Sequence, residues 1–129
     1  MILEKETENK IREKFRRDDF QDFMFESVFD SSKDEYDELY RNVYEYELQE
    51  IENELIFFVK CHIHHNIPIN RNSIVLFVLE NIVENLGDSD LDCKNIKFDA
   101  FCNQLYYMLF DIINKSYVFK NNRTLKRRE

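Results

Sequence analysis

The side chains with the best metal-ligand chemistry lie in one short segment, Cys61 to His65. On a helix Cys61 and His65 are one turn apart, so a thiolate and an imidazole could contact the same ion. Zinc sites need three or four protein ligands, and this segment places two on one side. Histidine near a helix C-terminus and a small buried cysteine are also ordinary structural features. We therefore expect no metal and no other cofactor, with Cys61 and His65 as the candidates for a metal site.

Other patterns of reactive residues are incomplete. Asp88, Asp90 and Asp92 match the first half of a calcium-binding loop, but Cys93 stands where the sharp turn needs glycine. The chain has a single glycine, which excludes a glycine-rich phosphate loop. Many carboxylates do not by themselves form an acid–base pair, because burial or coupling must first separate their pKa values. The sequence predicts a protein that is not an enzyme.

The most informative chemistry is a charge pattern. Between Asp18 and Glu54 the chain has fourteen carboxylates and two bases, a net charge of −12, against −8 for the whole protein. Like charges at helical spacing repel by about 0.2–0.5 kcal/mol per pair, so this stretch is under electrostatic strain. A segregated field of this kind favours association with a basic partner.

We expect the docking surface on a long helix, where carboxylates fall nearly in line beside a stripe of tyrosines. Tyrosine is a common interface anchor, because it combines apolar area with a polar tip. The predicted partner-binding residues are Asp34, Glu38, Glu45, Glu52, Tyr36, Tyr40 and Tyr44. The alternative is a solvated face that only maintains solubility, or one that a basic tail of the same chain neutralises.

Composition predicts the elements that position these residues. Of 129 residues 43% are apolar and 15% aromatic, which is enough for one hydrophobic core. One glycine and one proline are too few for the turns of a sandwich or barrel. We therefore predict an all-α, single-domain bundle of about five helices over residues 1–119, followed by a basic, mobile tail over 120–129.

Helical periodicity and capping residues predict the order of the helices. The segment 71–86 is apolar almost all round in its first half, so we expect it at the centre of the bundle, with Asn70 or Asn72 as its cap. On the long helix, Val43 and Tyr46 should widen the apolar face. The expected helices span about 3–17, about 20–29, Ser32 to about His64, about 71–86, and Asp92 or Asn95 to about 113.

These expectations lead to one functional hypothesis and one alternative. The hypothesis is a cytoplasmic binding protein that docks on a basic protein and inhibits or sequesters it, as an immunity protein, an antitoxin or a viral binder of a host factor does. The alternative is a structural or assembly subunit, for example a homodimer, that associates through the aromatic face of 20–29. Three cysteines and a charged N-terminus without an apolar leader favour a reducing, intracellular setting.

Two classes of partner are not expected. The longest apolar run, 74–79, is far shorter than the roughly 20 residues that cross a bilayer, so we predict no membrane partner. The acidic body would repel a phosphate backbone, so nucleic acid is expected only through contacts of the basic tail.

Overall fold

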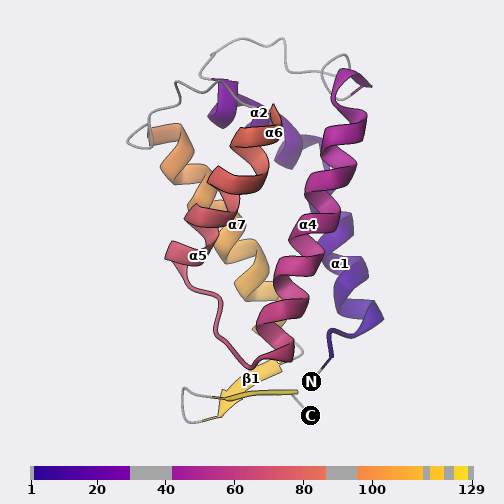
Figure 1. Cartoon of the computed structure of the whole chain (residues 1–129), viewed down its shortest axis with the longest axis vertical. Helices are drawn as coiled ribbons and strands as arrows, with labels where there is room; N and C mark the ends of the chain where they lie inside the picture. The colour runs from indigo at the N-terminus through magenta and orange to yellow at the C-terminus, as the bar shows by residue number, and fades with distance from the viewer. Residues whose placement is uncertain (1, 30–41, 87–95, 115–116, 121–123, 128–129) are drawn as a thin grey trace.

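The computed structural model describes residues 2–29, 42–86, 96–114, 117–120 and 124–127, and these form the predicted all-α bundle together with one short β-hairpin (Figure 1). The segment 71–86 is a continuous rod in which a π-helical stretch, η1, joins two α-helical ones. The elements are α1 (Lys5–Phe15), α2 (Asp18–Phe29), α4 (Glu45–His64), α5 (Arg71–Phe77), η1 (Val78–Val83), α6 (Glu84–Leu86), α7 (Ile96–Asn114), β1 (Tyr117–Lys120) and β2 (Thr124–Arg127).

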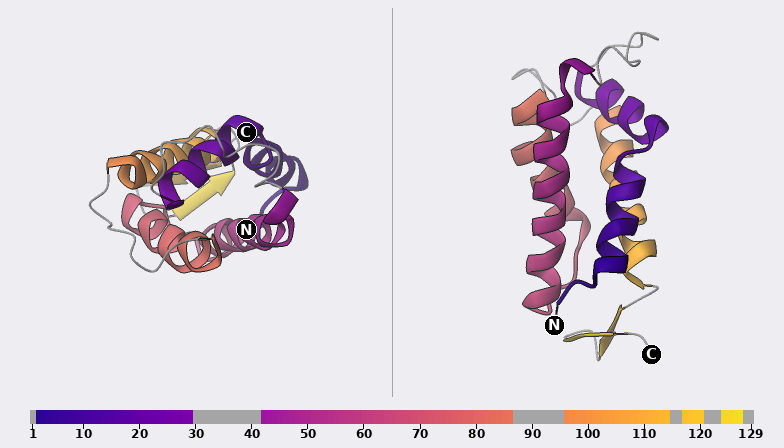
Figure 2. Two further views of the ribbon diagram at one scale, coloured as in Figure 1. Left: turned by 90° about the horizontal axis from the view of Figure 1, so that it is seen from above. Right: turned by 90° about the vertical axis from the view of Figure 1, so that its right-hand side faces the viewer.

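Four rods stand side by side around a common core. In order around the ring they are α1, α4, the α5–η1–α6 rod and α7, which again contacts α1 (Figure 2). Helix α2 crosses one end of this ring and packs on α1, α6 and α7, while the hairpin lies beyond the other end, next to α7. In the part of the chain that the structure describes, no helix combines the length and the apolarity needed to cross a membrane.

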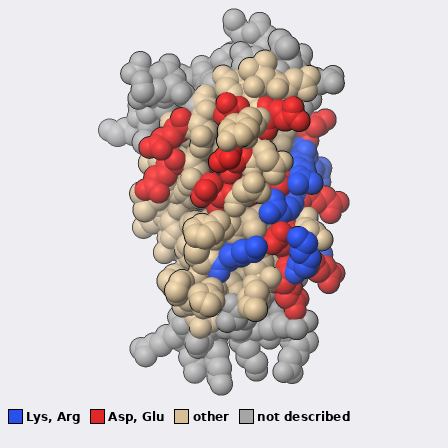
Figure 3. All heavy atoms as spheres, turned by 45° about the vertical axis from the view of Figure 1, so that its right-hand side comes forward, with Lys and Arg blue, Asp and Glu red and all other residues tan. Residues whose placement is uncertain are grey.

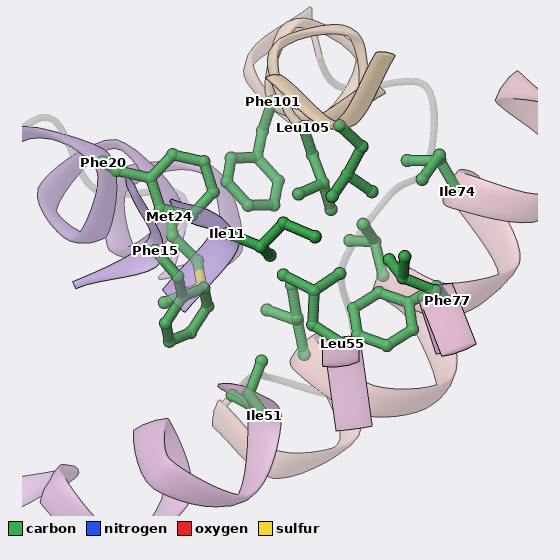
Figure 4. Close-up of a cluster of buried hydrophobic side chains, with 14 of the residues drawn as sticks. Ile11, Phe15, Phe20, Met24, Ile51, Leu55, Ile74, Phe77, Phe101 and Leu105 are labelled. Atoms are coloured by element: carbon green, nitrogen blue, oxygen red, sulfur yellow. The ribbon is translucent and has the colours of Figure 1, made fainter. Parts of the chain in front are cut away.

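The core is built from all of these helices (Figure 4). Phe20 of α2 links three of them, since its ring lies 5.8 Å from that of Phe15 in α1 and 5.5 Å from that of Phe101 in α7. Burying one such side chain contributes about 1.5–3 kcal/mol. Met24 and Phe25 of α2 are also buried, so Phe20, Met24 and Phe25 of the aromatic face of 20–29 belong to the core. At these positions the association surface expected from the sequence is not exposed, whereas Phe23 is half-buried and the side chain of Phe29 lies outside the described residues.

The rod over 71–86 lies in the wall of the bundle rather than at its centre, which differs from the expectation. Leu76 is 56% exposed, and Glu80 and Glu84 are exposed as well. The buried residues recur every fourth position and drift by about 40° per step around an α-helix. The wider π-helical turn of η1 removes part of this drift, so one stripe stays in the core. That stripe is Ile74, Val78, Ile82 and Leu86.

Asparagines set the helix ends on both sides of the turn between α4 and α5. Asn66 has a φ of 57°, in the left-handed region, and the amide of Ile67 donates to the carbonyl of His62 at 2.8 Å. The amide of Asn66 itself donates to Ile63 at 3.2 Å, which completes a Schellman motif. Asn70 then caps α5, because its side chain accepts from the backbone amide three residues later at 2.8 Å, as predicted.

Two sequence predictions about local structure are wrong. Val43 and Tyr46 are exposed rather than part of an apolar face, because Tyr44 leaves helical geometry and interrupts the expected periodicity. The segment expected as a tail from residue 120 instead begins in a hairpin, in which Tyr117 pairs with Arg127 and Lys120 with Thr124. Valine, phenylalanine, tyrosine and threonine favour strands, and the nearby basic residues obscured that signal.

Candidate functional site: the two flanks of helix α4

Helix α4 lies between α1 and the α5–η1–α6 rod, and its carboxylates divide between these two neighbours. Leu48, Leu55 and Val59 point into the core and separate the two sides. We call the side that contacts α1, with Glu52 and Lys60, the α1 flank. The acidic flank is the side that faces the rod, with Glu47, Glu50 and Glu54, together with Glu80 and Glu84 of the rod itself.

The aromatic contact between α4 and the rod locates the acidic flank. The rings of Phe58 in α4 and Phe77 in α5 lie 5.1 Å apart, so both mark the seam between the two rods. Glu54 stands about one helical turn before Phe58, and Glu47 about three turns before it. Glu80 lies in η1 and Glu84 in α6, and both of these elements contact α4. The five glutamates therefore lie on two neighbouring rods of the bundle.

On the α1 flank, Glu52 is only 2% exposed and is held by two arginines of α1. Its Oε2 accepts from Nη1 of Arg12 at 2.6 Å, and Nε and Nη2 of Arg16 donate to its two oxygens at 2.6 and 2.8 Å. The hydrogen bonds to Glu52 raise the pKa of Arg16 above its usual value. A buried carboxylate with these three charge-assisted bonds is fully compensated inside the protein.

Glu8 of α1 continues this network. It accepts from Lys5 at 3.1 Å and Arg12 at 3.1 Å, and it pairs with Lys60 of α4 at 3.2 Å. Burial by itself would raise the pKa of Glu8, but these three donors lower it from 4.5 to about 2. Across the α1 flank four bases meet two carboxylates, a local net charge of +2.

Glu52 is therefore not a partner-binding residue, contrary to the sequence prediction. Its partners stand 36 and 40 residues earlier in the chain, so the local charge pattern around Glu52 does not reveal them. The spacing of Glu8, Arg12 and Arg16 by four residues is the signal that sequence reasoning missed, because it places a carboxylate and two bases on one face of α1.

The acidic flank has the opposite character. Within the described residues, none of its five glutamates takes part in a salt bridge or side-chain hydrogen bond, and Lys60 and Arg71, the bases on the same rods, pair with Glu8 and Asp99 instead. Figure 3 shows acidic side chains over the upper part of this face and basic ones gathered along the side of α1. Glutamates at i and i+4, such as Glu80 and Glu84, repel without compensation.

Large apolar side chains are exposed beside these charges. Tyr46 is 72% exposed and Phe57 is 62% exposed on the outer face of α4, with Glu50 between them along the helix. Leu76 of α5 is 56% exposed, one turn before Glu80. The sequence pattern placed Tyr46 on the apolar face of the long helix and Leu76 in the helix that is apolar almost all round, and it did not single out Phe57.

The remaining predicted partner-binding residues have different outcomes. Glu45 is exposed at the first turn of α4, as expected for a contact residue. Tyr44 is half-buried, with its ring 6.0 Å from that of Phe25, so it is only partly available to a partner. The others, Asp34, Glu38, Tyr36 and Tyr40, lie outside the described residues, as does the Ser32–Glu35 capping box.

The candidate metal ligands do not assemble a site in the described part of the chain. Cys61 is half-buried and His65 is exposed, and no group of three or more potential ligands is close enough to hold an ion there. His62 contacts Phe58 within its own helix: its Nδ1 lies 2.8 Å from the carbonyl oxygen of Phe58, and the two ring centroids are 4.3 Å apart. Cys93 and the three aspartates that match the first half of a calcium-binding loop lie outside the described residues.

No protein-family model, curated protein or solved structure matches the chain. The charged surfaces of α4 and its neighbours are therefore the features from which a function can be argued.

Proposed function

We propose that the protein is an intracellular binding protein whose acidic flank docks on a basic protein. The single observation that supports this role is the set of five unpaired glutamates on two neighbouring rods, where the described residues supply no base. A partner carrying lysine or arginine side chains would relieve their mutual repulsion on binding. Among the described residues, the compensating bases are concentrated on the other flank, which leaves these glutamates available to the basic side chains of a partner.

The physics of such an interface follows from its composition. Complementary charge accelerates encounter and selects against acidic partners, and it contributes less to affinity than buried anchors do. The anchors offered here are Tyr46, Phe57 and Leu76, which are large and exposed next to the glutamates. Aromatic side chains at the centre of an interface contribute most of the binding energy when the partner covers them. The role is binding rather than catalysis.

Covering a basic surface would inhibit or sequester the partner. A basic surface is what nucleases and other nucleic-acid-binding proteins use to contact phosphate, so an acidic protein that occupies it competes with the nucleic acid. An immunity protein, an antitoxin or a viral protein that captures a host factor would act in this way.

The experiment uses two charge-reversal variants with the same change in net charge. The test variant, Glu54→Lys with Glu80→Lys, acts on the acidic flank. The control, Glu13→Lys with Asp111→Lys, acts on exposed carboxylates of α1 and α7 far from the seam. Each protein is immobilised and incubated with extract of the native host at low and high salt, and the retained proteins are quantified by mass spectrometry.

We expect wild type and control to retain the same basic protein at low salt. The flank variant should bind it at least about tenfold more weakly, and high salt should release it from all three. Retention by the flank variant equal to that of wild type, or retention indifferent to salt, would contradict the proposal. Circular dichroism of each variant checks that the helices are intact.

A further inference from the structure

A small pocket opens on the α1 flank, above Glu52, where the end of α1, the start of α2 and the first turns of α4 meet. Its volume is about 270 Å³. The floor is apolar, formed by Phe15 and Leu48, which are both buried. The walls are polar, and the ones that matter here are Arg16, Gln21, Glu45 and Gln49. None of these side chains belongs to the acidic flank.

Gln21 is the residue whose surroundings indicate a ligand site. The residue is 7% exposed, yet its carboxamide makes no hydrogen bond within the described part of the protein. In that same part, no fully enclosed side-chain nitrogen or oxygen lacks a partner, so the carboxamide is accessible from the pocket that it lines. A buried amide that faces an open pocket with both its donor and its acceptor unused is suited to a polar ligand.

The two charged groups in the pocket are separated and have opposite signs. Arg16 uses two of its five N–H donors on Glu52, which leaves three for another acceptor. Glu45 is exposed and has no partner in the described residues. Glu45 and Glu52 are seven residues apart, about 10 Å along α4, so Arg16 at Glu52 and the Glu45 carboxylate lie at opposite ends of the pocket.

We infer that this pocket binds a small zwitterion of the α-amino-acid type. The ligand's carboxylate accepts from the free donors of Arg16, its ammonium group donates to Glu45, and the Gln21 carboxamide donates to the carboxylate or accepts from the ammonium group. Its side chain rests on Phe15 and Leu48. This inference does not depend on the proposed docking of a basic protein, because the two surfaces share no residue.

Charge and size favour this ligand over the obvious alternatives. A lone cation would meet Arg16, and a lone anion would meet Glu45, so a ligand with one charge is repelled at one end. A zwitterion satisfies both ends. Drug-sized molecules occupy pockets of about 300–1,000 Å³, and the volume here is just below that range. One amino acid is therefore the appropriate size.

The experiment titrates the full chain with each of the twenty free L-amino acids, followed by two-dimensional NMR of the backbone and the side-chain amides. We expect at least one, with an apolar or amide side chain, to bind at about 1 mM or tighter and to shift the side-chain amide signals of Gln21 and Gln49. The same amino acid with its amine acetylated and its carboxyl amidated keeps the side chain but loses both charges. It should not bind.

Three variants separate the pocket from a general charge effect. Gln21→Leu removes the carboxamide at similar volume, and Glu45→Gln removes the charge that holds the ammonium group; each should weaken binding about tenfold. Glu54→Gln removes one charge from the same helix on the acidic flank and should leave binding unchanged. Glu45 is exposed, so its variant remains informative even if Gln21→Leu fails to fold. Absence of binding by all twenty amino acids, or equal loss in Glu54→Gln, overturns the inference.

Discussion

Both flanks of α4 carry glutamates, but the glutamate on one flank is paired with bases and those on the other flank are not. On the α1 flank, Glu52 is buried and receives three hydrogen bonds from Arg12 and Arg16. On the acidic flank, Glu54 stands two residues further along the same helix and has no partner within the described residues. Two residues correspond to about 200° around a helix, so each glutamate faces a different neighbour. The neighbour determines whether a carboxylate stabilises the fold or remains available for binding.

The largest difference between the flanks should appear on removing one charge from each. Glu52→Gln leaves two arginines with a weaker acceptor beneath them, and breaking a buried ion pair of this kind costs about 3 kcal/mol of unfolding free energy. Glu54→Gln should change stability by no more than about 0.5 kcal/mol, since the side chain is exposed and unpaired. Urea unfolding measures both. Similar losses in the two variants would show that the flanks do not differ in this way.

Acid should weaken the α1 flank in a defined pH window. The pKa of Glu8 falls from 4.5 in the unfolded chain to about 2 in the folded protein. A lowered pKa means that the stabilisation is fully present above 4.5 and is lost as the pH falls toward about 2. We expect this group to account for about 2 kcal/mol, reduced from the full value of the shift because Lys5 and Lys60 are solvent-exposed.

The control for this window is Glu8→Gln. This variant should be less stable than wild type near neutral pH, and the two stabilities should converge as the pH falls through the window. Urea midpoints at a series of pH values give the comparison. A constant difference between the two proteins down to pH 2 would contradict the assignment of the network to Glu8.

The smallest effect should have the opposite sign. Neutralising the acidic flank with Glu50→Gln, Glu54→Gln, Glu80→Gln and Glu84→Gln removes two repulsive i, i+4 pairs and should stabilise the protein by about 0.5–1 kcal/mol at low salt. The gain should shrink at high salt, where exposed charges are screened. Thermal unfolding at the two salt concentrations measures it. A loss of stability would mean that these glutamates make contacts within the fold.

Much of the fold was predictable because it depends on local patterns. Asn70 as a cap and the helical phases of α4 and α7 follow from residue types and spacing over a few turns. Whether the segments 3–17 and 20–29 are continuous did not follow from the pattern, and the structure separates them into α1 and α2. The hairpin was not predicted, because each strand has only four residues and its strand-forming residues stand next to several basic ones. The wall position of 71–86 was missed as well, because apolar character on several sides does not show which side the other helices cover.

The candidate site was predictable only in outline. An acidic surface on α4 follows from composition, but the residues assigned to it from spacing included Glu52, which the arginines of α1 bury. Tyr46 was placed on the apolar face of the long helix and is exposed, and Phe57 was not singled out. Local spacing does not show that α1 covers Glu52, and Tyr44 leaves helical geometry just before Tyr46, so the expected phase does not extend through that position.

By itself the sequence determined that the chain forms helices, roughly where they begin and end, and that negative charge is concentrated in its first half. These properties arise from interactions between residues a few positions apart. Only the tertiary structure decided which carboxylates are neutralised, because ion pairs such as Glu52 with Arg12 join residues 40 positions apart through the packing of α1 on α4. Helix packing brings bases to one flank of α4 and none of the described bases to the other, and that asymmetry is where the proposed function lies.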